Sequence, residues 1–170
     1  LQIKGDVITP GYFNNHEANK EAFAEDGWFN SGDNGFIVNG KLTITGREKE
    51  TIIINGANYF CYEIEDIVNN LPGVLPTFVA ATSILDENLG TESLAVFFVP
   101  EVEAIENVAR LSKVIKGQVS KNIGLSVTYV IPITKSKFHK TTSGKIQRLQ
   151  FKKELEAGQF NEILKDVDIY

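Results

Sequence analysis

The sequence predicts an α+β fold, with a short mixed sheet flanked by helices that follows a small antiparallel β segment. Two apolar runs rich in β-branched and aromatic residues, 77–85 and 93–100, are typical of strands. Two other segments, 62–71 and 107–123, repeat apolar residues at helical spacing. The first 47 residues instead contain closely spaced turn residues, which allow only short elements. The 170 residues, 42% of them hydrophobic, suffice for one globular domain, or for one domain and a fragment of another.

The first 47 residues are divided into short pieces by glycine and asparagine. Asn39-Gly40 separates the short apolar runs 35–38 and 41–44, which is a strong signal for a two-residue hairpin. A short helix is expected over His16–Phe23. Because strands this short bury little apolar surface, we expect this part of the chain to lack a good core of its own.

From about residue 50 the elements begin with a strand and a helix. The β-branched run Thr51–Ile54 predicts a buried strand, and Asn55-Gly56 after it predicts a turn. Segment 62–71 carries its apolar residues on one helical face, and Pro72-Gly73 ends that helix.

Strands and helices then alternate. The runs 77–85 and 93–100 flank a polar loop, so we expect them to pair as strands. Segment 107–123 predicts an amphipathic helix, and 126–133 alternates like a strand. A further helix is expected through Leu155, which completes a compact unit of a small sheet with helices packed on it.

Composition argues against several functional classes. The formal net charge is −5, with no basic stripe carrying interleaved aromatic residues, so nucleic-acid binding is disfavoured. Cys61 is the only cysteine, which excludes an internal disulfide and favours a buried thiol over a nucleophile or a zinc ligand. His16 and His139 are far apart and lack a matching carboxylate motif, so no catalytic triad is predicted.

The sequence also lacks targeting signals. No apolar stretch approaches the roughly 18 residues of a membrane span, and no signal peptide is visible, so we expect a cytoplasmic protein. The chain starts at Leu1 and contains no methionine, so we expect a piece excised from a longer protein.

The turn Ser143-Gly144-Lys145 is the most informative feature of the chain. A lysine follows a hydroxyl-rich, glycine-containing turn just before a helix, which can bring one ammonium to a phosphate or a carboxylate. A phosphate-binding P-loop would need a glycine five residues before Gly144, and that position is His139. The P-loop is therefore disfavoured, and the turn alone leaves two alternatives, a solvated loop lysine and a catalytic cation.

Four segments form an ordered pattern along the chain: Gly27–Asp33, Leu42–Glu50, Ile53–Glu65 and Thr141–Arg148. Together they resemble the C-terminal third of adenylate-forming enzymes, the superfamily of acyl-CoA synthetases, fatty acyl-AMP ligases, peptide-synthetase adenylation domains and luciferases. The resemblance covers nearly the whole chain, and its strength lies in four motifs that occur in order at suitable spacings.

The resemblance implies an activity with its cofactors and partners. The family uses ATP and Mg²⁺ to convert a carboxylic acid to an acyl-adenylate, and then usually passes the acyl group to the thiol of CoA or of a carrier-protein phosphopantetheine. The implied partners are the chain's own N-terminal adenylation domain, an acyl or peptidyl carrier protein, and the acid. We favour a unit of a polyketide or peptide synthase; the alternatives are a piece of a free-standing acyl-CoA synthetase and a non-catalytic carrier-protein docking module.

The resemblance also implies a domain organisation. Residues 1–48 would be a strip of the large N-terminal domain, 49–160 the mobile C-terminal cap, and 161–170 a linker or a short terminal helix. The family's phosphate loop, adenine-binding segment, Mg²⁺ carboxylate and acyl pocket all belong upstream. We therefore expect no metal ligand in this chain and no activity from it alone.

Three residues match the nucleotide and hinge positions of the family. Asp33 would accept hydrogen bonds from the ribose hydroxyls of ATP, and its alternative is a turn aspartate. Arg47 would reach the ribose or a phosphate, and its alternative is a surface salt bridge with Glu48 or Glu50. Lys49 falls at the hinge, a role implied by its position alone.

Three other residues match positions used in the two half-reactions. Lys145 would bridge the α-phosphate and the carboxylate as they join. Gly56 and Asn58 would lie in the loop that lines the path of the thiol acceptor, although a plain hairpin turn or a strand-to-helix turn explains the glycine equally well. The family often has proline where this chain has Cys61 and His139, and neither difference removes a catalytic group.

Overall fold

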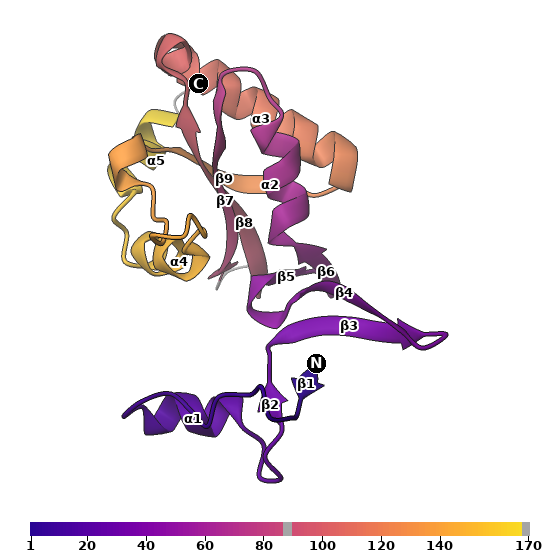
Figure 1. Ribbon diagram of the computed structural model, residues 1–170. Coiled ribbons are helices and arrows are strands. Elements are labelled where there is room, and N and C mark those ends of the chain that lie inside the picture. Colours follow the sequence, from indigo (N-terminus) through magenta and orange to yellow (C-terminus); the bar gives the residue numbers. More distant parts are fainter. Residues whose placement is uncertain (87–89, 168–170) are drawn as a thin grey trace. The chain divides into compact units, whose positions relative to one another are not determined.

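Figure 1 shows the computed structural model of the protein, which describes residues 1–86 and 90–167. The chain divides into two compact units, residues 1–51 and 52–170. The boundary predicted from the sequence, between residues 48 and 49, falls just before this division. The assignment of the first unit to a larger domain and of the second to a mobile cap stays a prediction.

The first unit contains short strand pairs. Asn39 and Gly40 connect β3 (Asp33–Val38) and β4 (Lys41–Arg47) with positive φ angles of 51° and 73°, as a type I′ hairpin turn requires, so the predicted hairpin is confirmed. The paired strands are β1 (Gln2–Ile3) with β2 (Phe29–Asn30), and β3 (Asp33–Val38) with β4 (Lys41–Arg47).

The helix of the first unit is α1 (His16–Ala22), which confirms the short helix expected there. It begins after Asn15, whose side-chain oxygen accepts a hydrogen bond from the amide of Ala18. None of residues 1–51, all of which the structure describes, is buried. The first unit therefore has no core of its own, as expected from its short elements.

The second unit is organised around a mixed sheet in the order β7 (Val74–Asp86), β8 (Thr91–Pro100), β9 (Val127–Pro132). β7 runs antiparallel to β8, and β9 runs parallel to β8. The predicted mixed sheet and the pairing of the two long apolar runs are both confirmed. The parallel pair needs a crossover connection, which contains α3 (Val108–Ile123).

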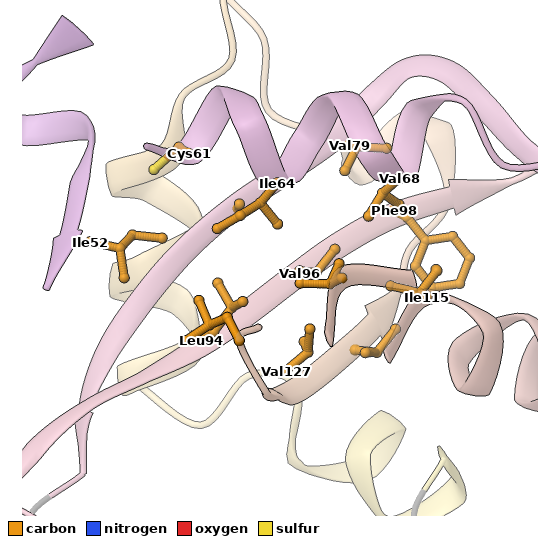
Figure 2. Packing of buried hydrophobic residues seen from close by; sticks show 14 of the residues in the cluster. Ile52, Cys61, Ile64, Val68, Val79, Leu94, Val96, Phe98, Ile115 and Val127 are labelled. Atoms are coloured by element: carbon orange, nitrogen blue, oxygen red, sulfur yellow. The ribbon is translucent and has the colours of Figure 1, made fainter. Parts of the chain in front are cut away.

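Helices cover both faces of this sheet (Figure 1). On one face, α2 (Cys61–Asn69) and α3 pack on the sheet, and Figure 2 shows Ile64 and Val68 of α2 among the buried side chains. On the other face, α4 (Arg148–Glu156) and α5 (Asn161–Val167) contribute to a second cluster that is rich in phenylalanine. Because neither face meets water, β8 is a continuous run of buried residues: Ser93, Leu94, Ala95, Val96, Phe97, Phe98 and Val99.

A second hairpin precedes α2. β5 (Thr51–Ile54) pairs with β6 (Ala57–Phe60), and the sequence did not predict β6. The expectation that β5 is buried is half wrong, since Ile52 and Ile54 are buried while Ile53 is 53% exposed. The reason is that alternate residues of a strand face opposite sides, and only one side of this hairpin meets the core.

The helices differ from their predicted bounds by a few residues. α2 was expected over 62–71 but ends at Asn69, and α3 starts at Val108 because a 3₁₀ helix, η2 (Val102–Asn107), precedes it. Within the expected segment 161–170, α5 confirms a short helix up to Val167, and the last three residues lie outside the described range. In the part of the chain that is described, no helix is long and apolar enough to cross a membrane.

Candidate functional site

The residues around Lys145 form a small closed hairpin, residues 139–147, which we call the lysine turn. The Thr141 amide donates to the Lys145 carbonyl at 2.9 Å, and the Lys145 amide donates to Thr141 Oγ1 at 3.1 Å. Gly144 has a φ angle of 85°, which explains the glycine because side chains rarely adopt that conformation. Lys140 and Ile146 pair antiparallel below the turn. The backbone at Lys145 is therefore held in one conformation by local hydrogen bonds.

The side chain of Lys145 itself is exposed. Among the side chains that the structure describes, no carboxylate forms an ion pair with its ammonium. A fixed backbone with an unpaired cation fits both alternatives drawn from the sequence, and it leaves the ammonium available to an anionic ligand.

A buried ion pair braces the C-terminal end of the lysine turn. Arg148, the first residue of α4, donates from Nε and Nη2 to the two carboxylate oxygens of Glu65 on α2, both at 2.7 Å. Their side chains are only 17% and 6% exposed. Glu65 Oε1 also accepts the amide of Ala81, at 2.9 Å, on the edge strand β7. The bidentate ion pair attaches the start of α4 to α2, and the bond to Ala81 attaches Glu65 to the sheet.

Sequence reasoning missed this pair, because 83 residues separate its members. A signal was present: Glu65 is an acidic residue beside Ile64 on the buried side of an amphipathic helix. A buried carboxylate requires a partner, and Arg148 directly after the turn motif was a candidate.

His139 lies at the other end of the lysine turn with a structural partner. Its Nε2 lies 2.9 Å from Oε2 of Glu154, and Gln150 donates to the other oxygen of that carboxylate at 2.7 Å. The imidazole is thus held against a carboxylate of α4, and the absence of a catalytic triad stays a prediction.

In the first unit, Asp33 and Arg47 form an ion pair. They are cross-strand partners on β3 and β4, and Arg47 Nε donates to Asp33 Oδ1 at 2.8 Å. Arg47 Nη2 also donates to the Ser31 carbonyl at 3.1 Å. The alternative partners expected for Arg47, Glu48 and Glu50, were wrong for this contact, because the hairpin register places Asp33 directly opposite.

Asp33, Arg47 and Lys49 line one cavity of about 770 Å³ within the first unit. Asp33 Oδ2 has no hydrogen bond to the described residues, so this oxygen can accept from a ligand. Lys49 lies in the short 3₁₀ helix η1 (Glu48–Glu50), and its ammonium is 3.7 Å from Glu21 with both side chains largely exposed. An ion pair this exposed holds Lys49 only weakly.

Gly56 occupies the turn between β5 and β6. Asn55 and Gly56 have φ angles of 51° and 77°, which again match a type I′ turn. A Cβ on Gly56 would meet no described atom within 4 Å, so the backbone conformation alone explains the glycine within this chain. Asn58 is exposed on β6. Both residues are thus accessible to a partner.

The predicted residues fall into three places. Asp33, Arg47 and Lys49 share the first unit. In the second unit, the lysine turn adjoins the phenylalanine-rich cluster through Ile146, whereas the β5–β6 hairpin adjoins the cluster of α2 and α3 through Ile52. Across the described residues, no group of three or more His, Cys, Asp or Glu side chains is placed to hold a metal ion.

No protein-family model matches the chain. Among curated proteins, the chain is similar to the nonribosomal peptide synthetase apvA of Aspergillus terreus, with 36% identity over 164 residues, which are 94% of this chain and 18% of that protein. The chain spans less than a fifth of the length of the first curated relatives that it matches.

Two solved structures are similar along almost all of the chain. The structure of McyG A-PCP complexed with phenylalanyl-adenylate has a TM-score of 0.91 and 41% identity, over 99% of this chain and 26% of that one. The adenylation, ketoreductase and pseudo Asub multidomain structure of a keto acid-selecting NRPS module has a TM-score of 0.90 and 46% identity, over 98% of this chain and 14% of that one.

Proposed function

We propose that this chain, which matches the C-terminal portion of the adenylate-forming enzymes in sequence and in fold, works as that portion of a ligase. The complete enzyme would activate a carboxylic acid as its adenylate and then transfer the acyl group to a thiol. The A-PCP structure and the peptide-synthetase relatives favour a phosphopantetheine on a carrier protein over CoA as the acceptor. A cytoplasmic location agrees with this function and stays a prediction.

In the first half-reaction, a carboxylate oxygen of the acid attacks the α-phosphorus of ATP. The bond from that phosphorus to the pyrophosphate oxygen breaks, and pyrophosphate leaves with the electron pair. The ammonium of Lys145 would contact the α-phosphate and the attacking carboxylate, where negative charge is concentrated in the transition state. Its exposure and its lack of a carboxylate partner within the described residues support this role.

Asp33 and Arg47 would hold the nucleotide. A carboxylate can accept hydrogen bonds from both hydroxyls of a ribose, and Asp33 keeps Oδ2 for this while Arg47 fixes Oδ1. ATP is used with Mg²⁺, which stabilises phosphate charge. Because the described residues offer no ligand set for this ion, we expect residues outside the chain to hold it.

In the second half-reaction, the thiol sulfur attacks the acyl carbonyl, the carbon–oxygen bond to AMP breaks, and the thiol proton is lost. Gly56 and Asn58 would line the path of the phosphopantetheine arm, and Lys49 would lie at the hinge between the two working positions. Their exposure supports these roles.

The observation that carries the proposal is the lysine turn, in which an exposed cation sits on a backbone that is closed locally and followed by a buried ion pair. The test is Lys145→Ala in the full-length protein, measured by ATP–pyrophosphate exchange. The acid used would be the best substrate in a panel of amino acids and keto acids, the two kinds that the solved relatives handle. We expect exchange to fall about 100- to 1,000-fold, the usual effect of removing one placed stabilising group.

The matched control is Lys113→Ala, which removes another exposed lysine, on α3. It should leave exchange unchanged. Exchange that survives Lys145→Ala would contradict the proposed role.

A further inference from the structure

β7 carries a bulge with an unusual backbone conformation. Val74 pairs with Pro100, and the next pair along the strand is Val79 with Phe98, so β7 has extra residues between them. Within this bulge, Thr77 has a φ angle of 66°. A β-branched residue rarely adopts this conformation, which persists only where its surroundings impose it.

Two side chains hold Thr77 in place. Asn69, the last residue of α2, accepts the Thr77 amide on Oδ1 at 2.9 Å. Lys140 donates from Nζ to the Thr77 hydroxyl at 3.2 Å.

Lys140 also lies over an aromatic ring that the bulge presents. Its ammonium is 3.8 Å from the centre of the Phe78 ring and 5.7 Å from that of Phe138, and the two rings meet edge to face at 5.3 Å. An ammonium this close to a ring face is attracted by the ring's quadrupole. Burial, and then the charge of Lys135, lower the pKa of Lys140, so the site keeps its cation against an electrostatic cost.

The position of Lys140 in the chain links this contact to the lysine turn. Lys140 pairs with Ile146 at the base of the turn, and Ile146 is the residue that follows Lys145. The base is therefore attached to β7 through Lys140 on one strand, while Arg148 attaches the following residues to α2 through Glu65. Without the Lys140 contacts, the N-terminal strand of the turn would keep the contact of His139 with Glu154 on α4 but would lose its attachment to Thr77 and Phe78 of β7.

We propose that Lys140, through Thr77 and Phe78, is a positioning residue that sets the place of the Lys145 ammonium in the adenylation step. This inference rests on the proposed function of Lys145. Lys140 touches neither substrate in this role; it acts by fixing the strand that leads to Lys145.

The test compares Lys140→Met, which keeps an apolar stem of similar length, with Lys140→Arg, which keeps a cation over the ring. In the full-length protein, Lys140→Met should lower kcat of pyrophosphate exchange about 10- to 100-fold, as misplacement of a reacting group by about 1 Å does. The KM for ATP and the transfer of the acyl group from supplied acyl-adenylate to the thiol should change little. Lys140→Arg should recover most of the exchange rate, and Lys113→Met should have no effect.

Thr77→Gly removes the hydroxyl that Lys140 contacts without adding backbone strain, because glycine readily adopts a positive φ angle. Its effect on activity can therefore be separated from a loss of folded stability. It should lose part of the exchange rate without a lower melting temperature, whereas Thr77→Ser, which keeps the hydroxyl, should retain it. An exchange rate that follows the melting temperature across these variants, or a loss in both half-reactions, would show a purely structural role and overturn the proposal.

A double variant separates the two proposals. If Lys140 acts only through Lys145, adding Lys140→Met to Lys145→Ala should cause no further loss of exchange. Additive losses would overturn the positioning role. An inactive Lys145→Ala beside an unaffected Lys140→Met would overturn it too while leaving the proposed function intact, and a fully active Lys145→Ala would contradict the proposed function itself.

Discussion

Two arginine–carboxylate pairs among the described residues differ in almost every physical respect. Arg47 and Asp33 meet through one bond of 2.8 Å in a unit without buried residues, and their side chains are 57% and 27% exposed. Arg148 and Glu65 meet through two bonds of 2.7 Å beside the main core, and they are 17% and 6% exposed.

The difference indicates a division of work. An exposed pair contributes little to stability, because water competes for both partners, and for the same reason it can exchange a hydrogen bond for one to a ligand. A buried pair cannot lose one partner without leaving an uncompensated charge, so it fixes the elements that carry it. Asp33–Arg47 is thus suited to binding and Glu65–Arg148 to support.

The largest expected effect is on the buried pair. Arg148→Ala leaves the Glu65 carboxylate without its main partner, and breaking a buried pair in this way typically costs about 3–5 kcal/mol. In thermal unfolding of the full-length protein, the cooperative transition of the second unit should move to a clearly lower temperature. A loss of stability no larger than that expected for an exposed pair would show that the two sites do not differ in this way.

The next effect should appear in binding rather than in stability. Asp33→Asn removes the carboxylate charge, and the loss of hydrogen bonds to a charged group corresponds to about a 10- to 100-fold higher KM for ATP. The melting temperature should hardly change, since exposed pairs contribute at most about 1 kcal/mol. A stability loss comparable with that of Arg148→Ala would refute the assignment of this pair to binding.

Two glycines offer a matched pair of substitutions with effects of intermediate size. Gly144 and Gly56 both have positive φ angles, and a Cβ on either would meet no described atom within 4 Å. Alanine at each site should therefore cost a similar backbone strain of about 1–2 kcal/mol. We expect Gly144→Ala to slow pyrophosphate exchange and Gly56→Ala to slow thioester formation; identical kinetic profiles would show that the two loops are not specialised.

The smallest effect concerns Lys140. Burial, and then the charge of Lys135, lower the pKa of this lysine below its usual range. Between its folded pKa and the ordinary value, the unfolded chain binds more protons, so folded stability should rise slightly with pH across that window. The slope should disappear in Lys140→Met, as measured by urea unfolding over that pH range. If the dependence of stability on pH is the same in Lys140→Met, groups other than Lys140 cause it.

Local features of the fold were predictable from the sequence. The hairpin at Asn39-Gly40 and the turn at Asn55-Gly56 were both predictable, because two consecutive positive φ angles suit these residue types. The apolar runs of β7 and β8 were predictable because residues buried on both faces leave a continuous pattern. The sequence motifs also singled out Lys145, through a family resemblance rather than through the chemistry of the turn alone.

Contacts between distant segments were not predictable. The bonds of Arg148 to Glu65 and of Lys140 to Thr77 join residues 83 and 63 positions apart, and neither has a local pattern. Arg47 was paired with its near neighbours, whereas the register of the hairpin selected Asp33. β6 was missed because Ala57–Phe60 shows no alternation strong enough to separate a strand from a turn.

The absence of buried residues from the first unit has a practical consequence for dissecting the protein. Every side chain that the structure describes as buried lies after Thr51. A polypeptide that begins at Thr51 would keep both hydrophobic clusters, the braced lysine turn and the β5–β6 hairpin. We expect it to fold independently, which would suit it to NMR studies of the turn, whereas residues 1–51 expressed separately should remain without stable tertiary structure.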